Sequence, residues 1–95
     1  MKMLHADEVE LIGQWHSDAG KISADDTCHR IGHLIQERLI RIATDSTGWR
    51  TLYRDPQDSR LWELNYTQNE LHGGGPPRLT CVSSEYAEAI YAVKA

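Results

Sequence analysis

The feature that most constrains this chain is a hairpin pattern in its middle. Two aromatic-rich segments, residues 49–54 and 61–66, flank the sequence Asp-Pro-Gln-Asp-Ser at 55–59. That sequence favours a turn, because Pro fixes φ and Asp side chains bond to nearby backbone N–H groups. The flanking aromatic residues favour strands. The middle of the chain is therefore predicted to form an antiparallel β-hairpin.

The aromatic residues also predict how the two strands pair. Pairing Arg54 with Leu61 places all four aromatic side chains on one face, whereas a shift by one residue would divide them between both faces. Cross-strand aromatic pairs stabilise a hairpin by about 0.2–1 kcal/mol each. The four side chains are Trp49, Tyr53, Trp62 and Tyr66. We interpret Trp49 and Trp62 as core residues, because large aromatic side chains dominate small cores. If they stay exposed, they suit a protein interface instead.

A helical pattern precedes the hairpin, at about residues 24–42. Its apolar side chains recur every three or four residues, so they form one stripe along a helix. Asp25 or Asp26 is placed to cap the first turn. The stripe consists of Cys28, Ile31, Ile35, Leu39 and Ile42. We predict that it faces the core.

A second helix is predicted near the C-terminus, at about residues 84–93. Ser83 or Ser84 is placed to cap it. Its inner face is predicted to carry Tyr86, Ile90 and Val93.

The remaining segments give weaker patterns. Residues 4–15 fit a short helix or turn that breaks at Gly13, with a strand as the alternative. Residues 17–23 fit a turn. Residues 69–77 fit a loop, because two prolines do not suit a central strand. Residues 79–82 fit a third short strand.

Together these elements predict an α+β fold with a single domain over residues 1–95. We expect two layers, in which a three- to four-stranded antiparallel sheet is packed on one face by the two helices.

Composition restricts the class of partner. The net charge is −4, and residues 1–29 hold two Lys against six acidic residues. Because phosphate contacts dominate nucleic-acid affinity, an acidic chain without a basic stripe predicts no nucleic-acid binding. No apolar run approaches the ~18 residues of a membrane span, and the N-terminus lacks the pattern of a signal peptide. We therefore expect a cytoplasmic protein without a membrane partner.

The two cysteines agree with that location. Cys28 and Cys81 are far apart and lack metal-binding or redox spacing, so two reduced, buried thiols are expected in preference to a disulfide.

Two groups of residues suggest chemistry without completing a site. His29 and His33 have the i, i+4 spacing of a metal pair, but further ligands are missing from the pattern, and a solvated pair is the simpler interpretation. Glu70 and His72 lie beside three consecutive glycines and offer an acid–base pair, but no recognisable nucleophile accompanies them. We expect neither a metal nor a cofactor.

Read together, the segments resemble the immunity protein 27 family of bacterial polymorphic toxin systems. The resemblance covers most of the chain, from about Leu11 into the last helix. Its residues are Leu11-Ile12-Gly13-x-Trp15, then Asp26 and Ile31, Gly48-Trp49-x-x-Leu52-Tyr53-x-Asp55-Pro56-x-Asp58, Trp62-Glu63-Leu64-x-Tyr66, and Glu70-x-His72-Gly73-Gly74-Gly75-Pro76-Pro77-x-Leu79. The chain departs from the pattern at Ser59, where Gly is expected, and at Thr67, where Pro is expected.

The resemblance implies a small cytoplasmic protein without an active site. It would bind the C-terminal domain of a cognate secreted toxin and protect the producing cell during contact-dependent inhibition. A nuclease is one candidate for that toxin domain. Immunity proteins of this type often present acidic surfaces to basic toxins, and complementary charge accelerates association. The residues expected to contact the toxin are Glu8, Glu10, Asp18, Asp55, Asp58, Glu70 and His72.

Two other functions stay open from sequence alone. One is a small hydrolase that uses Glu70 and His72. The other is a general protein-interaction module outside toxin systems.

Overall fold

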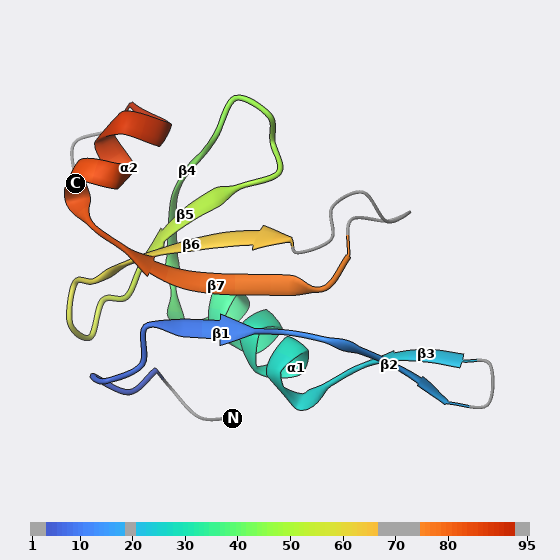
Figure 1. Cartoon of the computed structure of the whole chain (residues 1–95). Coiled ribbons are helices and arrows are strands. Elements are labelled where there is room, and N and C mark those ends of the chain that lie inside the picture. Colours follow the sequence, from blue (N-terminus) through green and yellow to red (C-terminus); the bar gives the residue numbers. More distant parts are fainter. Residues whose placement is uncertain (1–3, 19–20, 67–74, 93–95) are drawn as a thin grey trace.

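The centre of the molecule is a five-stranded antiparallel sheet in the order β1-β7-β6-β5-β4 (Figure 1). The computed structural model describes residues 4–18, 21–66 and 75–92. The sheet consists of β1 (Glu10–Ile12), β4 (Ile40–Thr44), β5 (Thr51–Arg54), β6 (Leu61–Tyr66) and β7 (Pro77–Val82). The other elements are the hairpin strands β2 (Trp15–Asp18) and β3 (Lys21–Ala24), helix α1 (Asp26–His33), the π-helical turn η1 (Leu34–Arg38) and helix α2 (Ser84–Tyr91). The predicted α+β class is confirmed, whereas three to four strands was too few.

The central hairpin pairs as predicted. Arg54 lies opposite Leu61, and Tyr53 lies opposite Trp62. The turn between β5 and β6 is closed by a hydrogen bond from Asp55 N to Arg60 O (2.9 Å).

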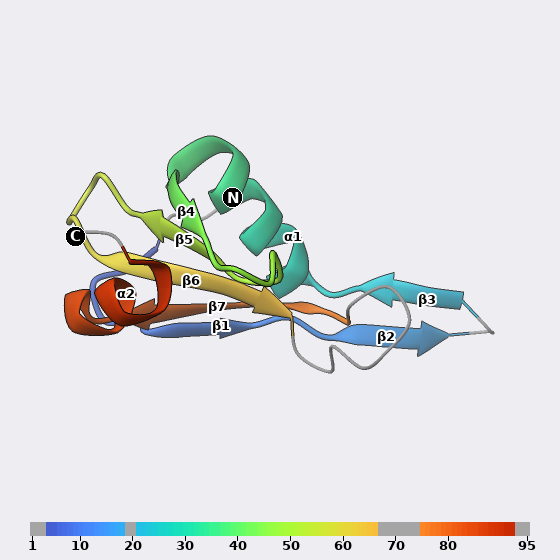
Figure 2. The ribbon, with the colours of Figure 1, turned by 90° about the horizontal axis from the view of Figure 1, so that it is seen from above.

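The two helices pack on opposite faces of the sheet, which corrects the expectation of two layers with both helices on one face (Figure 2). Neighbouring residues of a strand point to opposite faces. Trp62 accordingly packs with Ile31 of α1, and its neighbour Leu61 packs with Ala87 of α2. The sheet is thus buried on both sides, by one small core under each helix.

The helix predicted at 24–42 is much shorter. Asp25 caps α1 as predicted, because its side chain accepts a hydrogen bond from Cys28 N (2.8 Å). The helix then widens into η1, where Leu39 N donates to Leu34 O (2.7 Å). Residues 40–44 form the edge strand β4 instead of a last helical turn. The sequence Ile-Arg-Ile-Ala-Thr is rich in β-branched residues, and pairing with β5 satisfies its backbone.

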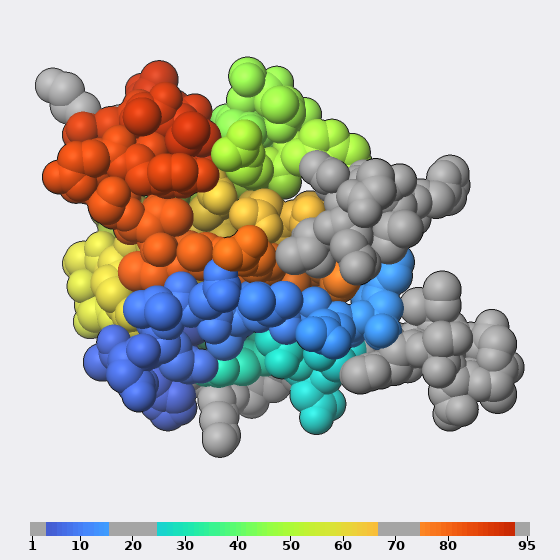
Figure 3. All heavy atoms as spheres, in the orientation of Figure 1, coloured from blue at the N-terminus to red at the C-terminus, as the bar shows by residue number. Residues whose placement is uncertain are grey.

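The N-terminal segments form strands, although a helix or turn was predicted at 4–15 and a turn at 17–23. β1 pairs with β7 along the edge of the sheet, and the two segments, blue and orange, lie side by side on the surface in Figure 3. β2 and β3 pair with each other and form an arm that extends past the end of the sheet (Figures 1 and 2). Gly13 joins β1 to β2, and its N–H donates to Pro77 O (2.8 Å).

Most of the loop predicted at 69–77 lies outside the described residues, and its last residue, Pro77, belongs to β7 instead. A proline fits a central strand at this position, since the first residue of a strand need not donate to the ladder.

The C-terminal helix begins as predicted but buries a different face. Ser83 caps it by accepting a hydrogen bond from Tyr86 N (3.1 Å). Ala87 and Tyr91 are buried, whereas Ile90, predicted to face inward, is exposed. The prediction of the inner face did not include the buried carboxylate of Glu63, which lies beneath the helix. This carboxylate accepts hydrogen bonds from Tyr91 Oη (2.8 Å) and Tyr86 Oη (2.9 Å) and so orients the helix.

Both cysteines are free thiols, as expected from their spacing. Cys28 is buried and Cys81 is half-buried. Among the described residues, no helix has the length and apolar character needed to cross a membrane.

Candidate protein-interaction site

Two of the acids expected to contact a partner are held by arginines of the same chain. The Glu8 carboxylate receives two hydrogen bonds from the Arg30 guanidinium, at 2.6 and 2.7 Å. The hydrogen bonds from Arg30 lower the pKa of Glu8 from its usual value of 4.5 to about 2. Glu10 forms an ion pair with Arg78 across β1 and β7. These acids stabilise the N-terminal segment as well as adding negative charge to the surface.

Asp58 belongs to a similar network at the hairpin turn. Its carboxylate accepts a hydrogen bond from Arg60 Nε at 2.6 Å. The other guanidinium nitrogens of Arg60 donate to the backbone oxygens of Glu8 (2.6 Å) and His5 (2.8 Å). The guanidinium also lies 5.0 Å from the centre of the Trp62 ring, a cation–π distance. Arg60 thus connects the turn to the N-terminal segment.

Asp55 is buried, with 4% of its surface exposed. One carboxylate oxygen accepts a hydrogen bond from Gln57 N (2.9 Å). Its carbonyl accepts another from Ser59 N (2.7 Å), and Ser59 adopts φ 65°. Asp55 therefore shapes the turn, and its carboxylate does not lie on the surface as a toxin contact would require.

Three other expected contact residues cannot be placed. Glu70 and His72 lie outside the described residues, as does the Asp18 side chain. The acid–base pair suggested for the hydrolase alternative therefore lies outside the described residues too.

His29 is exposed and His33 is half-buried. Within the described part of the chain, no three His, Cys, Asp or Glu residues are close enough to hold a metal ion.

A pair of exposed aromatic side chains lies at the other end of the hairpin. Trp49 is 53% exposed and Tyr66 is 36% exposed, which corrects the interpretation of Trp49 as a core residue. Their rings meet edge to face, with centres 6.4 Å apart. Trp62 of the same predicted row is fully buried, as expected. The row of aromatic residues is thus core beneath α1 and surface beyond it.

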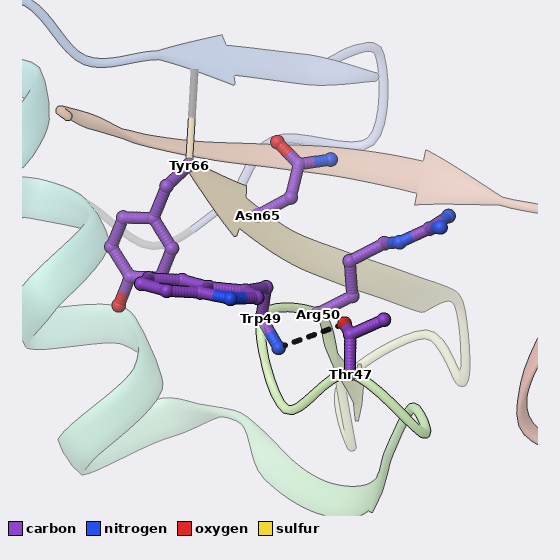
Figure 4. Close-up of a pocket in the computed structure, with 5 residues that line it drawn as sticks. All are labelled: Thr47, Trp49, Arg50, Asn65 and Tyr66. Carbon is purple, nitrogen blue, oxygen red and sulfur yellow. Dashed lines mark hydrogen bonds between the residues drawn. The ribbon is translucent and has the colours of Figure 1, made fainter. Parts of the chain in front are cut away.

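A pocket of about 350 Å³ opens beside this pair (Figure 4). We call its lining the aromatic patch: Thr47, Trp49, Arg50, Asn65 and Tyr66. The pocket combines two aromatic faces with amide, hydroxyl and guanidinium groups. Trp, Tyr and Arg are the residues most enriched at the energetic centres of protein interfaces.

The loop before β5 holds Trp49 in place. Asp45 Oδ1 accepts hydrogen bonds from Gly48 N (3.0 Å) and Thr47 Oγ1 (2.8 Å). Gly48 adopts φ 81°, a conformation that favours glycine. Thr47 Oγ1 in turn accepts a hydrogen bond from Trp49 N (3.2 Å; Figure 4). A loop bonded in this way fixes the backbone from which the exposed indole projects.

Two hydrogen-bonded side chains connect the patch to the sheet. Arg50 Nε lies 3.2 Å from Asp45 Oδ2, and Arg50 Nη1 donates to Tyr86 Oη (3.3 Å). Asn65 Nδ2 donates to Glu63 Oε1 (3.2 Å). Because these polar groups are already positioned, a partner would lose less entropy in ordering them.

The sequence indicated Trp49 and Tyr66 as a pair but did not indicate their exposure. Their aromatic character was clear, and the predicted register placed them opposite each other. Whether they are core depends on which part of the sheet α1 covers, and that is decided by tertiary packing.

One protein-family model matches the chain, that of immunity protein 27, over residues 17–83. The matched segment is more than half of the 95-residue chain and includes the aromatic patch and the central hairpin. No curated protein and no solved structure matches the chain.

Proposed function

The chain belongs to the immunity protein 27 family, and on that premise we propose that it binds and neutralises a cognate secreted toxin domain. It acts in the cytoplasm of the producing cell, during competition between bacteria that depends on contact. It covers the toxin and breaks no bond of its own.

The aromatic patch supports a specific contact surface for this role. The exposed Trp49–Tyr66 pair, next to the fixed guanidinium of Arg50, is the observation that carries the proposal at residue level. A Trp or Tyr anchor buried at the centre of an interface contributes 2 kcal/mol or more, which corresponds to about 30-fold or more in affinity. We place the centre of the toxin interface here.

The acidic residues support a second, separate contribution. Glu8, Glu10 and Asp58 lie near the other end of the hairpin, where Arg60 joins the turn to the N-terminal segment. Because each of these acids is paired with an arginine, it is the overall charge of −4 that would accelerate association with a basic toxin such as a nuclease, without forming the centre of the interface.

Replacing the aromatic residues tests the proposal. The chain is co-expressed with a cognate toxin domain, and growth and the Kd of the purified complex are measured. W49A and Y66A are expected to weaken binding by about 30-fold or more and to reduce protection. W15A is the matched control, because Trp15 is 37% exposed but lies on β2, outside the patch. Full affinity in W49A/Y66A, or an equal loss in W15A, would remove the patch from the interface.

The hydrolase alternative has its own test. In an inhibitor, replacing both Glu70 and His72 by alanine reduces affinity at most. In an enzyme the same change abolishes turnover. Substrate turnover by the purified chain that disappears in this double variant would replace the proposed function.

A further inference from the structure

A second hollow lies on the α2 side of the sheet, at the edge formed by β4. It has a volume of about 600 Å³, and we call it the edge groove. Its lining comes from β4, the last residue of β5, the first residue of β6, the turn between them and the first residue of α2. It includes Ile40, Arg41, Arg54, Leu61 and Ser84. Arg54 and the Trp49 of the aromatic patch are five residues apart, roughly 16 Å along an extended strand. The two sites therefore lie at opposite ends of β5.

The pairing of the strands explains the character of the groove. Ile40 lies opposite Arg54, and Arg54 lies opposite Leu61, so these side chains form one row across three strands. Residues directly opposite each other point to the same face of a sheet. Helix α2 buries Leu61, but Ile40 remains 46% exposed. An aliphatic side chain is thus left open beside a guanidinium.

The charge of the groove is positive although the protein is acidic. Arg30, Arg50, Arg60 and Arg78 each form an ion pair with a carboxylate of the chain. Arg41 and Arg54 line the groove, and neither forms an ion pair with a carboxylate among the described residues. An acidic group of a partner would supply that missing contact.

The outer edge of β4 disfavours pairing with most other β-strands. β4 pairs with β5 on one side, and in the described sheet no strand pairs with its other side. The register shifts between Arg41 and Ala43, which marks a bulge at Ile42. A charge and a bulge on an edge strand discourage pairing between copies of the chain. An acidic strand turns the same charge into an attraction.

We propose that the edge groove is a docking site for an extended acidic segment of another protein, in which an aliphatic and an acidic side chain lie two residues apart and so point to the same face. Its backbone lies along β4, the aliphatic side chain contacts Ile40, and the carboxylate pairs with Arg54. This mode of recognition draws affinity from backbone hydrogen bonds and specificity from alternate side chains.

A peptide titration of the isotope-labelled full chain tests the proposal by NMR. The probe is a terminally blocked Val-Thr-Asp-Thr-Val peptide, whose Val and Asp side chains point to one face when it is extended, and the control peptide replaces the Asp by Lys. We expect saturable amide shifts centred on residues 40–44 with the acidic peptide, and none with the basic one. R54Q should weaken binding by about fivefold or more, as for a partly exposed charge-assisted hydrogen bond. R38Q is the matched control, because Arg38 is exposed but does not line the groove.

Three outcomes would overturn the proposal. The first is the absence of saturable shifts up to about 5 mM peptide, a concentration at which even weak binding would be detected. The second is equal binding of the basic peptide, and the third is unchanged affinity in R54Q. Concentration-dependent shifts of residues 40–44 without peptide would assign the groove to a second copy of the chain instead. None of these measurements involves the toxin, so the proposal fails or stands independently of the immunity function.

Discussion

At the scale of single residues, the Glu8–Arg30 pair connects the N-terminal segment to helix α1. The two side chains are half-buried, with 22% and 18% of their surfaces exposed, and they share two hydrogen bonds. Bidentate pairs between Arg and a carboxylate are among the stronger ion pairs, because the guanidinium and carboxylate geometries match. Glu8 also accepts a hydrogen bond from His5 N (2.8 Å). The carboxylate therefore closes a local turn and attaches it to the helix.

This pair predicts a specific pH dependence of stability. The pKa of Glu8 is lowered from 4.5 to about 2 in the folded protein, chiefly by the hydrogen bonds from Arg30. A lowered carboxyl pKa contributes stability that is fully present above the unfolded pKa and is lost as the pH falls toward the folded pKa. We expect E8Q to unfold at lower urea concentration than the wild type at pH 7. The difference should shrink between pH 4.5 and about 2.

The control for this prediction is an R30Q background. Without the guanidinium, the E8Q substitution should add little pH-dependent difference. A gap between wild type and E8Q that stays constant down to pH 2 would show that the ion pair does not contribute as described.

At the scale of elements, Gly13 is the point where β1, β7 and α1 meet. A Cβ atom at this position would lie 2.6 Å from Cys28 Sγ and 2.8 Å from Pro77 O. Overpacking of this kind costs about 1–3 kcal/mol, and the carbonyl belongs to a strand that cannot easily move away. G13A is therefore expected to lower the free energy of unfolding by that amount in urea denaturation.

Gly32 in α1 is the matched control for this prediction. Nothing lies within 4 Å of a Cβ atom built there. Alanine in a helix is more favourable than glycine by about 0.5–1 kcal/mol, so G32A should stabilise the protein. Equal stability of G13A and the wild type would mean that the three elements have room to separate.

Among the elements, the hairpin register could be predicted from the sequence, but the end of α1 could not. Four aromatic residues define only one good register, so the pairing of Tyr53 with Trp62 was predictable. The end of α1 was not. Leu39 and Ile42 continue a helical spacing, while Ile40, Ile42 and Thr44 have strand spacing, and only pairing with β5 favours the second pattern.

The candidate site was less predictable than the fold for a related reason. Exposure of Trp49 depends on which part of the sheet α1 covers, which local pattern does not determine. Partners of acidic residues likewise come from distant segments, as Arg78 does for Glu10. Glycine was expected at Ser59 from the family resemblance, and Ser59 adopts φ 65°, a conformation that favours glycine.

At the scale of the whole molecule, charge and shape serve different purposes. Two of the described ion pairs join acids of residues 1–29 to arginines later in the chain, Glu8 to Arg30 and Glu10 to Arg78. Partly exposed pairs contribute only about 0–1 kcal/mol each. Each pair is neutral as a unit, so the net charge of −4, which acts on a charged partner over about 8–10 Å at physiological salt, comes from the other charged residues. Charge thus affects the rate of encounter, while the aromatic patch supplies the contact.

The arm formed by β2 and β3 is the exception to the otherwise continuous packing of the molecule, whose longest extent is 46 Å. β2 and β3 pair only with each other among the described strands, and the arm meets the rest of the chain at its base, where Asp25 N donates to Gln14 O (3.0 Å). An isolated two-stranded hairpin is at best marginally stable in water. β6 and β7, by contrast, lie in the middle of the sheet, and their side chains enter both cores.

Amide hydrogen exchange, measured residue by residue by NMR, should therefore be faster in the arm than in the central strands. We expect the paired amides of β2 and β3 to exchange about 100-fold faster or more than those of β6 and β7, because they open locally while the central strands require global unfolding. β1 serves as the internal control, because it is also an edge strand but pairs with β7. Protection of the arm equal to that of β6 would mean that it opens only with the whole molecule. If the arm contacts the toxin, its exchange should slow in the complex, and unchanged exchange there would confine the interface to the rest of the chain.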